Sequence, residues 1–73
     1  MAVIIKVLDQ NSKKPKSGIR VSYSSNRGSG SEKWTDDSGC VQYQVDPISA
    51  TVTIKGDRKP EQYLKNGENV FYI

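Results

Sequence analysis

The sequence has no histidine, one cysteine and one tryptophan among its 73 residues. Without histidine, Ser-His-Asp and Cys-His catalytic groups and imidazole-based metal sites are excluded. Because Cys40 has no second cysteine to pair with, no intrachain disulfide compensates for a thin core, as disulfides do in small secreted domains. These absences predict a protein that is not an enzyme, uses no cofactor or metal, and works in a reducing, cytoplasmic setting.

Long apolar runs are also missing. The first ten residues, MAVIIKVLDQ, contain aliphatic side chains but neither a secretory apolar core of roughly 7–15 residues nor a cleavage site. No stretch approaches the roughly 18 apolar residues that indicate a transmembrane helix. We therefore expect no secretory leader and no membrane partner.

Charge of one sign is not strongly in excess. Eleven basic and eight acidic residues give a net charge of +3, and the basic residues cluster at 13–16 and 55–59. A small excess favours solubility and a weak attraction to polyanions, without predicting strong nucleic-acid binding. A chain of this length has no room for a second core, so we expect one domain over residues 1–73.

What the chain does have is alternation of apolar and polar residues, which is typical of β-strands. The expected strands are 2–8, 19–25, 32–35, 40–45, 50–55, 62–64 and 69–73. Their phase places Val21, Tyr43 and Ile54 in the core, and Asn66-Gly67 predicts a hairpin between the last two strands. Turns every 8–12 residues or so predict an all-β fold, a small antiparallel Ig-like sandwich of about seven short strands, or alternatively a small barrel.

Two turn-rich segments could be mistaken for ligand sites. The segment TDDSG at 35–39 combines Asx, serine and glycine residues, and we expect it to form the corner between two paired strands. It lacks the acidic spacing of an EF-hand loop, so a turn is favoured over a calcium site. The segment NRGSGS at 26–31 is predicted to be a flexible loop, because its two glycines and small polar residues pack nothing. No helix follows it, so a phosphate-binding loop is not favoured.

Cys40 is the one residue with a potential redox role. It is in phase with Gln42 and Gln44, which predicts a position on the outer face of its strand. A thiol becomes reactive when a cation lowers its pKa, and Lys33 or Lys55 could do so only if strand pairing brought one close. An inert, partly buried thiol is therefore favoured over a redox or intermolecular role.

The aromatic residues suggest an alternative function. Single-stranded nucleic acid binds where aromatic rings stack on bases beside a basic groove, as in small OB-type barrels. Tyr23 and Tyr43 are in phase with core valines and isoleucines, which favours burial. Trp34, delivered to the core edge by its short strand, is the best candidate for an exposed ring, while Tyr63 and Tyr72 complete the set.

Three segments, KPKSGIRVSYSS, WTDDSGCVQYQV and ATVTIKG, resemble carboxypeptidase regulatory-like domains, which belong with the transthyretin-like (prealbumin-like) and CnaB-like β-sandwiches. The resemblance covers roughly residues 3 to 56 and rests on Pro15, Gly18, Val21, Thr35, Asp36, Gly39 and Tyr43. It implies an Ig-like sandwich of seven strands that usually serves as a noncatalytic accessory or binding module.

The CnaB-like relatives add one further possibility. Some of them form an isopeptide bond between a lysine and an asparagine or aspartate on the first and last strands, promoted by a buried acid. Lys6 and Asn69 lie in strands of that kind, but Glu32 is the nearest candidate acid. The resemblance therefore raises the possibility of an isopeptide bond, but the sequence does not favour it.

Together these observations favour a noncatalytic sandwich that binds a protein through exposed edge strands or loop tips. The outward positions of the strands and one loop give a candidate interaction surface. Its residues are Arg20, Ser22, Ser24, Arg27, Trp34, Gln42 and Gln44. The alternative is a small barrel that binds single-stranded nucleic acid weakly.

Overall fold

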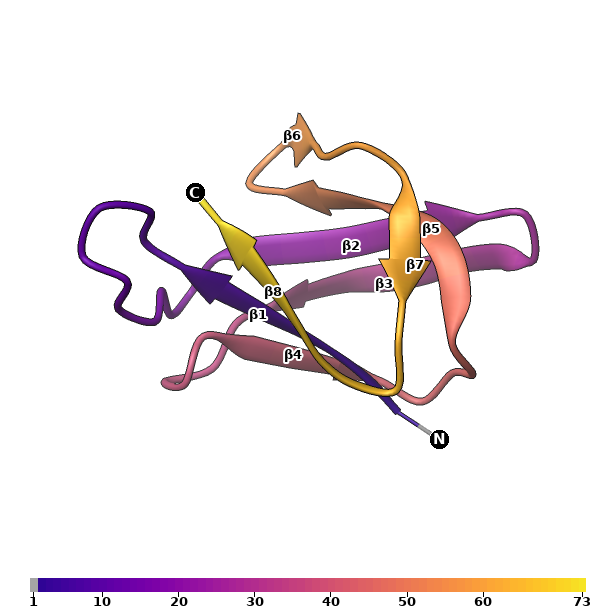
Figure 1. The fold of residues 1–73 in the computed structure, drawn as a ribbon, viewed down its shortest axis with the longest axis horizontal. Coiled ribbons are helices and arrows are strands. Elements are labelled where there is room, and N and C mark those ends of the chain that lie inside the picture. The colour runs from indigo at the N-terminus through magenta and orange to yellow at the C-terminus, as the bar shows by residue number, and fades with distance from the viewer. Residues whose placement is uncertain (1) are drawn as a thin grey trace.

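The computed structural model describes residues 2–73, which form β-strands and no helix (Figure 1). The strands are β1 Val3–Leu8, β2 Arg20–Ser25, β3 Gly28–Trp34, β4 Cys40–Tyr43, β5 Ile48–Ile54, β6 Asp57–Arg58, β7 Gln62–Leu64 and β8 Gly67–Tyr72. The all-β prediction is confirmed. Residues 2–73 contain eight strands where about seven were expected, because the two-residue strand β6 lies between the expected strands 50–55 and 62–64.

The strands form two sheets that pack face to face. The smaller sheet has the order β4-β1-β8, and the larger has the order β3-β2-β5-β6, with β7 also pairing to β5. All pairings are antiparallel except that between β1 and β8, which is parallel. The sequence predicted an antiparallel sandwich, and this is wrong for one pair of strands. The first strand, β1, and the last, β8, run side by side in the same direction.

Alternation along each strand builds the core. Val3, Ile5 and Val7 are fully buried on β1, while the residues between them are only partly covered. On the larger sheet, Val21 lies opposite Ile54. The two inner faces together bury Val3, Ile5, Val7, Val21, Tyr23, Val41, Tyr43, Ala50, Val52, Ile54, Leu64 and Phe71. The predicted inward phase of Val21, Tyr43 and Ile54 is thus confirmed.

The predicted hairpin at Asn66-Gly67 is wrong. β7 pairs with β5 in the larger sheet, whereas β8 pairs with β1 in the smaller one, so this turn carries the chain between sheets. The Asn66 carboxamide oxygen accepts from the Ala2 N–H at 3.1 Å, and the Gly67 N–H donates to the Ala2 carbonyl at 3.0 Å. These bonds join the turn to the start of β1, which directs the last strand alongside the first.

The predicted flexible loop at 26–31 is also wrong over most of its length. Residues from Gly28 onward belong to β3, which pairs with β2 through a hairpin containing a register shift between Val21 and Tyr23. Gly30 lies opposite Tyr23, and a Cβ at Gly30 would overlap the Tyr23 ring. The glycine is there because an aromatic ring packs against it, which local composition alone does not reveal.

The Thr35–Gly39 turn is confirmed as a turn, but it does not join paired strands. It connects β3, which pairs with β2, to β4, which pairs with β1 in the other sheet. The Asp36 carboxylate accepts from the N–H groups of Ser38 (2.9 Å) and Cys40 (3.0 Å). Thr35, and not Trp34, is the buried residue at this corner, where its hydroxyl accepts from the Ile19 N–H at 2.9 Å.

Candidate functional site

The residues expected to form an interaction surface do not form one surface. Arg20, Ser22 and Ser24 alternate with buried residues of β2, so they lie on the outer face of the larger sheet. Trp34 lies opposite Arg20 on β3 and its side chain is 61% exposed, which confirms that it is an exposed aromatic. These four residues are therefore brought together, and Ser22 alone among them is only partly exposed.

The other three lie elsewhere. Gln42 is on the outer face of the smaller sheet, opposite Ile4 of β1. Arg27 and Gln44 lie at one end of the molecule, where both line a pocket. Strand phase predicts which positions are exposed, but it does not predict which sheet each strand joins. The seven residues are therefore divided among the outer face of the larger sheet, the outer face of the smaller sheet and the pocket.

On the larger sheet the charge of Arg20 is already paired with that of Glu32. The Arg20 Nε lies 3.2 Å from a carboxylate oxygen of Glu32, and both side chains are about half exposed. Exposed pairs of this kind contribute little to stability. Glu32 lies on the edge strand β3, and charges and register shifts are devices that discourage a further strand from pairing there.

The outer face of the smaller sheet is the more apolar one. We call Ile4, Leu8, Val70 and Tyr72 the β8 face. Val70 and Tyr72 are 45% and 47% exposed, and Ile4 and Leu8 are partly buried. Strand phase alone does not reveal this face, because the Asn66-Gly67 signal predicts that the last strand pairs with residues 62–64.

Basic groups border the β8 face. Lys13 Nζ lies 4.6 Å from the centre of the Tyr72 ring, a cation–π contact. Lys6 Nζ lies 3.9 Å from a carboxylate oxygen of Glu68 on β8. β8 is the last strand of its sheet, and none of the described strands pairs with its outer edge (Figure 1).

The acidic turn and the first loop use their carboxylates structurally. The Asp9 side chain accepts from the N–H groups of Ser12 (3.0 Å) and Asn11 (2.7 Å), which lowers its pKa against the opposing effect of burial, with a smaller contribution from Lys16. Among residues 2–73, no group of three or more His, Cys, Asp or Glu side chains could hold a metal ion. The described part also contains no helix long and apolar enough to cross a membrane.

Cys40 lies opposite Lys6 and in phase with Gln42, on the outer face as predicted, and it is partly buried. Burial raises the pKa of its thiol, and the Asp36 carboxylate raises it further; the cation that opposes them is Lys6. Neither Lys33 nor Lys55 plays the part considered from the sequence: Lys33 donates to the Gln42 carbonyl at 2.7 Å. A thiol in this setting is mostly protonated at neutral pH and poorly nucleophilic.

The geometry opposes an isopeptide bond between Lys6 and Asn69. Lys6 reaches Glu68 on the outer face, whereas the Asn69 carboxamide donates to the carbonyls of Ile4 (3.1 Å) and Lys65 (3.0 Å). Asn69 also accepts from the Lys65 N–H at 2.9 Å. Its amide group is thus fully used in holding the turn before β8 against β1.

The surroundings of Tyr43 strongly raise the pKa of its hydroxyl. Its hydroxyl donates to the Ser31 carbonyl at 2.7 Å and lies 3.2 Å from the Val21 carbonyl, so it links β4 to both strands of the opposite hairpin. Burial, followed by Tyr23 and Glu32, raises the pKa of Tyr43 from 10.0 to about 12. The folded protein therefore favours the neutral phenol.

This shift predicts alkaline destabilisation. A raised folded pKa contributes stability that is fully present below pH 10.0 and is lost as the pH rises toward about 12. We expect the loss to be on the order of 2 kcal/mol. Urea unfolding at neutral pH and at about pH 11 measures it. Tyr43→Phe should remove the alkaline loss and cost about 1 kcal/mol at neutral pH.

The exposed Tyr63 provides the control for this measurement, because its side chain is 62% exposed. Tyr63→Phe should retain both the neutral stability and the alkaline loss of the original protein. An alkaline loss of the same size in Tyr43→Phe would contradict the assignment to Tyr43.

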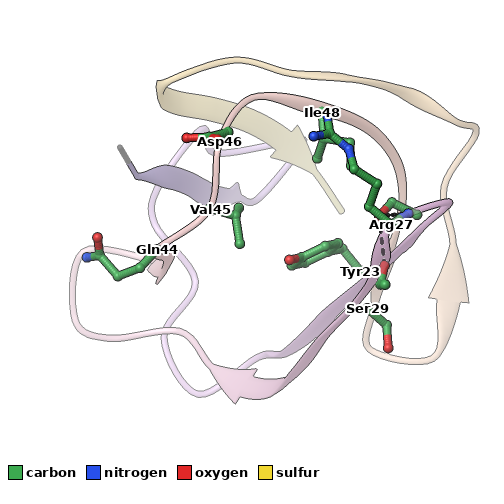
Figure 2. A pocket seen from close by; sticks show the side chains of 9 residues that line it. Tyr23, Arg27, Ser29, Gln44, Val45, Asp46 and Ile48 are labelled. Atoms are coloured by element: carbon green, nitrogen blue, oxygen red, sulfur yellow. Dashed lines mark hydrogen bonds between the residues drawn. The ribbon is translucent and has the colours of Figure 1, made fainter.

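The pocket lies at the end of the molecule where the β2–β3 hairpin faces the segment between β4 and β5 (Figure 2). Its volume is about 330 Å³. Tyr23, Ser25, Arg27, Gly28, Ser29, Gln44, Val45, Asp46 and Ile48 line it. Two of these residues, Arg27 and Gln44, are exposed as predicted, but nothing in the sequence pattern shows that they share a concave site.

Comparison of the chain with protein-family models, with curated proteins and with solved structures gives no match.

Proposed function

We propose that the protein is a noncatalytic, prealbumin-like sandwich module that binds an extended segment of a partner protein along the outer edge of β8. The observation that carries this proposal is the position of β8: six residues pair with β1 on one side only. An extended peptide gains affinity on such an edge by completing its backbone hydrogen bonds. The neighbouring β1 and β8 also agree with the resemblance, in whose family first and last strands are close enough to be cross-linked.

The side chains of β8 supply a basis for specificity. Val70 and Tyr72 project outward and remain nearly half exposed, so apolar side chains of an added strand have a surface to pack against. Lys13 beside Tyr72 and Lys65 just before β8 are exposed cations. We infer that the partner segment alternates apolar residues and carries acidic residues near its ends.

The titratable groups support the noncatalytic part of the proposal. General acid–base catalysis needs a group whose pKa is close to the working pH. The pKa of Asp9 is lowered from 3.8, while those of Cys40 and Tyr43 are raised from 9.0 and 10.0. Each of these shifts moves the group further from neutrality, as expected for side chains that stabilise turns and packing.

Binding is tested by selecting random short peptides displayed on phage against the immobilised protein. We expect enriched peptides with alternating apolar residues, and slower amide hydrogen exchange across Gly67–Tyr72 when a synthetic copy binds. Val70→Lys and Tyr72→Lys should each weaken binding roughly tenfold or more, because they remove apolar contact at the edge. Both positions are exposed, so the fold should be retained.

Ser24→Lys is the matched control, since it adds the same charge to the outer face of the other sheet. It should bind the selected peptides as the original protein does. Failure to enrich any peptide, or peptides whose affinity is equal for Val70→Lys and Ser24→Lys, would contradict the proposal.

Nucleic-acid binding is the second candidate, and the positions of the rings support it less. Tyr23 and Tyr43 are buried, while Trp34 and Tyr63 lie on β3 and β7, which are separated by β2 and β5. Tyr72 is on the other sheet. Binding of single-stranded oligonucleotides that falls steeply with salt would favour this candidate over the protein-binding one.

A further inference from the structure

The outer edge of β8 presents backbone groups that β1 does not use. Gly67 and Ile73 donate their N–H groups to carbonyls of the Ala2–Leu8 segment, at 3.0 and 2.9 Å, so both residues point towards β1. In a parallel pair, alternate residues of a strand bond to the same neighbour, and the residues between them point the opposite way. The N–H and C=O groups left at the free edge therefore belong to Glu68, Val70 and Tyr72.

The same residues carry the exposed side chains of β8. Glu68, Val70 and Tyr72 are all exposed, while Phe71 between the last two is buried in the core. Glu68 and Tyr72 lie at equal distances along the strand on either side of Val70. β8 is thus itself an extended segment with alternating apolar residues and an acidic residue near one end, which is the description inferred above for the partner segment.

We propose that this partner segment is β8 of a second copy of the chain, an inference that rests on the proposed function. The two β8 strands run antiparallel about a twofold axis at Val70. Val70 then lies opposite Val70 of the second copy, and Glu68 lies opposite its Tyr72. All the free backbone groups of the edge are paired in this register, and the two smaller sheets become one sheet of order β4-β1-β8-β8-β1-β4.

Charge complementarity favours this register. Lys13 Nζ lies 4.6 Å from the centre of the Tyr72 ring, so a cation stands beside the residue that Glu68 of the second copy faces. Glu68 then lies between Lys6 of its own chain, whose Nζ is 3.9 Å away, and Lys13 of the other copy. Because the axis is twofold, the contact between Glu68 and Lys13 forms at both ends of the paired strands. A register with Glu68 opposite Val70 would lose it.

The other edges of the described sheets are less suited to this pairing. On β4, which is shorter, the Gln42 carbonyl already accepts from Lys33 Nζ at 2.7 Å. On β3 the pairing with β2 contains a register shift, and Glu32 is held by Arg20. β6 has only two residues. β8 is therefore the edge with the longest run of regular pairing and self-complementary side chains.

A single pair of edge strands buries less surface than the roughly 1,200–2,000 Å² of a stable interface, so the dimer should be weak. We expect a dissociation constant on the order of 100 µM. Sedimentation equilibrium of the full chain over roughly 10 µM to 1 mM should then show a monomer–dimer equilibrium. A chain that stays monomeric throughout this range would overturn the proposal.

Amide hydrogen exchange shows whether β8 forms the interface. At the upper concentration we expect exchange at Glu68, Val70 and Tyr72 to slow by about fivefold, as the edge becomes paired. Exchange at Asn69 and Phe71 should change less, because their hydrogen bonds to β1 are already present in the monomer. A dimer in which the first three amides exchange at unchanged rates would also overturn the proposal.

Exchanging charges tests the register. Glu68→Lys and Lys13→Glu each bring like charges together at both ends of the paired strands, so each variant alone should dimerise roughly tenfold more weakly. An equal mixture of the two variants restores both opposite pairs, and its heterodimer should match the affinity of the original chain within about threefold. Lys65→Glu is the control, because it makes the same charge change just before β8 and should dimerise as the original chain does. A mixture that associates no better than its components would contradict the register.

The outcomes separate this inference from the proposed function. A monomeric chain that still binds the selected peptides across Gly67–Tyr72 would exclude the second copy as the partner and leave the β8 edge as a peptide site. A monomeric chain that binds no peptide would overturn both proposals.

Discussion

Replacing Gly39 with alanine is expected to lower the free energy of unfolding by about 3 kcal/mol or more. Two effects add. Gly39 has a φ of +77°, where an L side chain is strained. A Cβ would also lie 2.7 Å from the Val7 carbonyl oxygen and 3.1 Å from the Lys16 nitrogen, both backbone atoms that cannot turn aside. The turn between the sheets would have to move away from β1, breaking the 2.7 Å bond from the Val7 N–H to the Gly39 carbonyl.

Gly18→Ala separates these two effects. Gly18 has a similar φ of +67°, but nothing lies within 4 Å of a Cβ built there. It should therefore cost only the conformational strain, about 1–2 kcal/mol. Urea unfolding of the two variants measures the difference. Equal losses would mean that Gly39 does not pack against β1 as described.

Replacing Gly30 with alanine should lower the free energy of unfolding by about 2 kcal/mol or more, although this position was expected to be a flexible loop. Its backbone does not need a positive φ, so the effect is purely steric. The new Cβ would overlap the buried Tyr23 ring and approach Tyr43 to 2.9 Å. The two rings are already packed edge to face, so neither can move without opening the core.

Ser29→Ala, at the exposed neighbouring position, is the control and should change stability by less than about 0.5 kcal/mol. The near-ultraviolet circular dichroism of Gly30→Ala should also change, because it reports the tyrosine environment. If Gly30→Ala were as stable as Ser29→Ala, residues 28–34 would not form a strand against the core.

Alternation was sufficient to predict the core of the fold. In β2, buried Val21 and Tyr23 alternate with polar residues, and the pattern of β5 around Val52 is the same. Such strands have one covered face, and a period of two marks it directly. Where every second residue is apolar, the buried face of a strand can be identified without knowing which strand it pairs with.

The pattern failed where tertiary contacts decide the structure. β3 has almost no apolar residues, yet it pairs with β2, and its Gly30 lies against the Tyr23 ring where a Cβ would not fit. Asn66-Gly67 is a strong local hairpin signal, but its hydrogen bonds to Ala2 take the chain to the opposite sheet. In both places the determining partner is distant along the chain, where local rules give no information.

The candidate sites were less predictable than the fold for the same reason. Exposure follows from strand phase, which identified Ser24 and Gln42 as exposed, and from loop position, which identified Arg27. An edge or a pocket depends on which strands are neighbours. The β8 edge exists because β8 joins β1, and the pocket exists because the segment between β4 and β5 comes to lie across from the β2–β3 hairpin.

The parallel pairing of β1 and β8 is the central claim, since it creates both the smaller sheet and its free edge. Nuclear Overhauser contacts between backbone protons of the two strands test it most directly. The register predicts contacts linking Ile5 with Asn69 and Val7 with Phe71. Contacts linking Tyr63 with Val70 across an Asn66-Gly67 hairpin, with none between β1 and β8, would contradict the fold and remove the proposed binding edge.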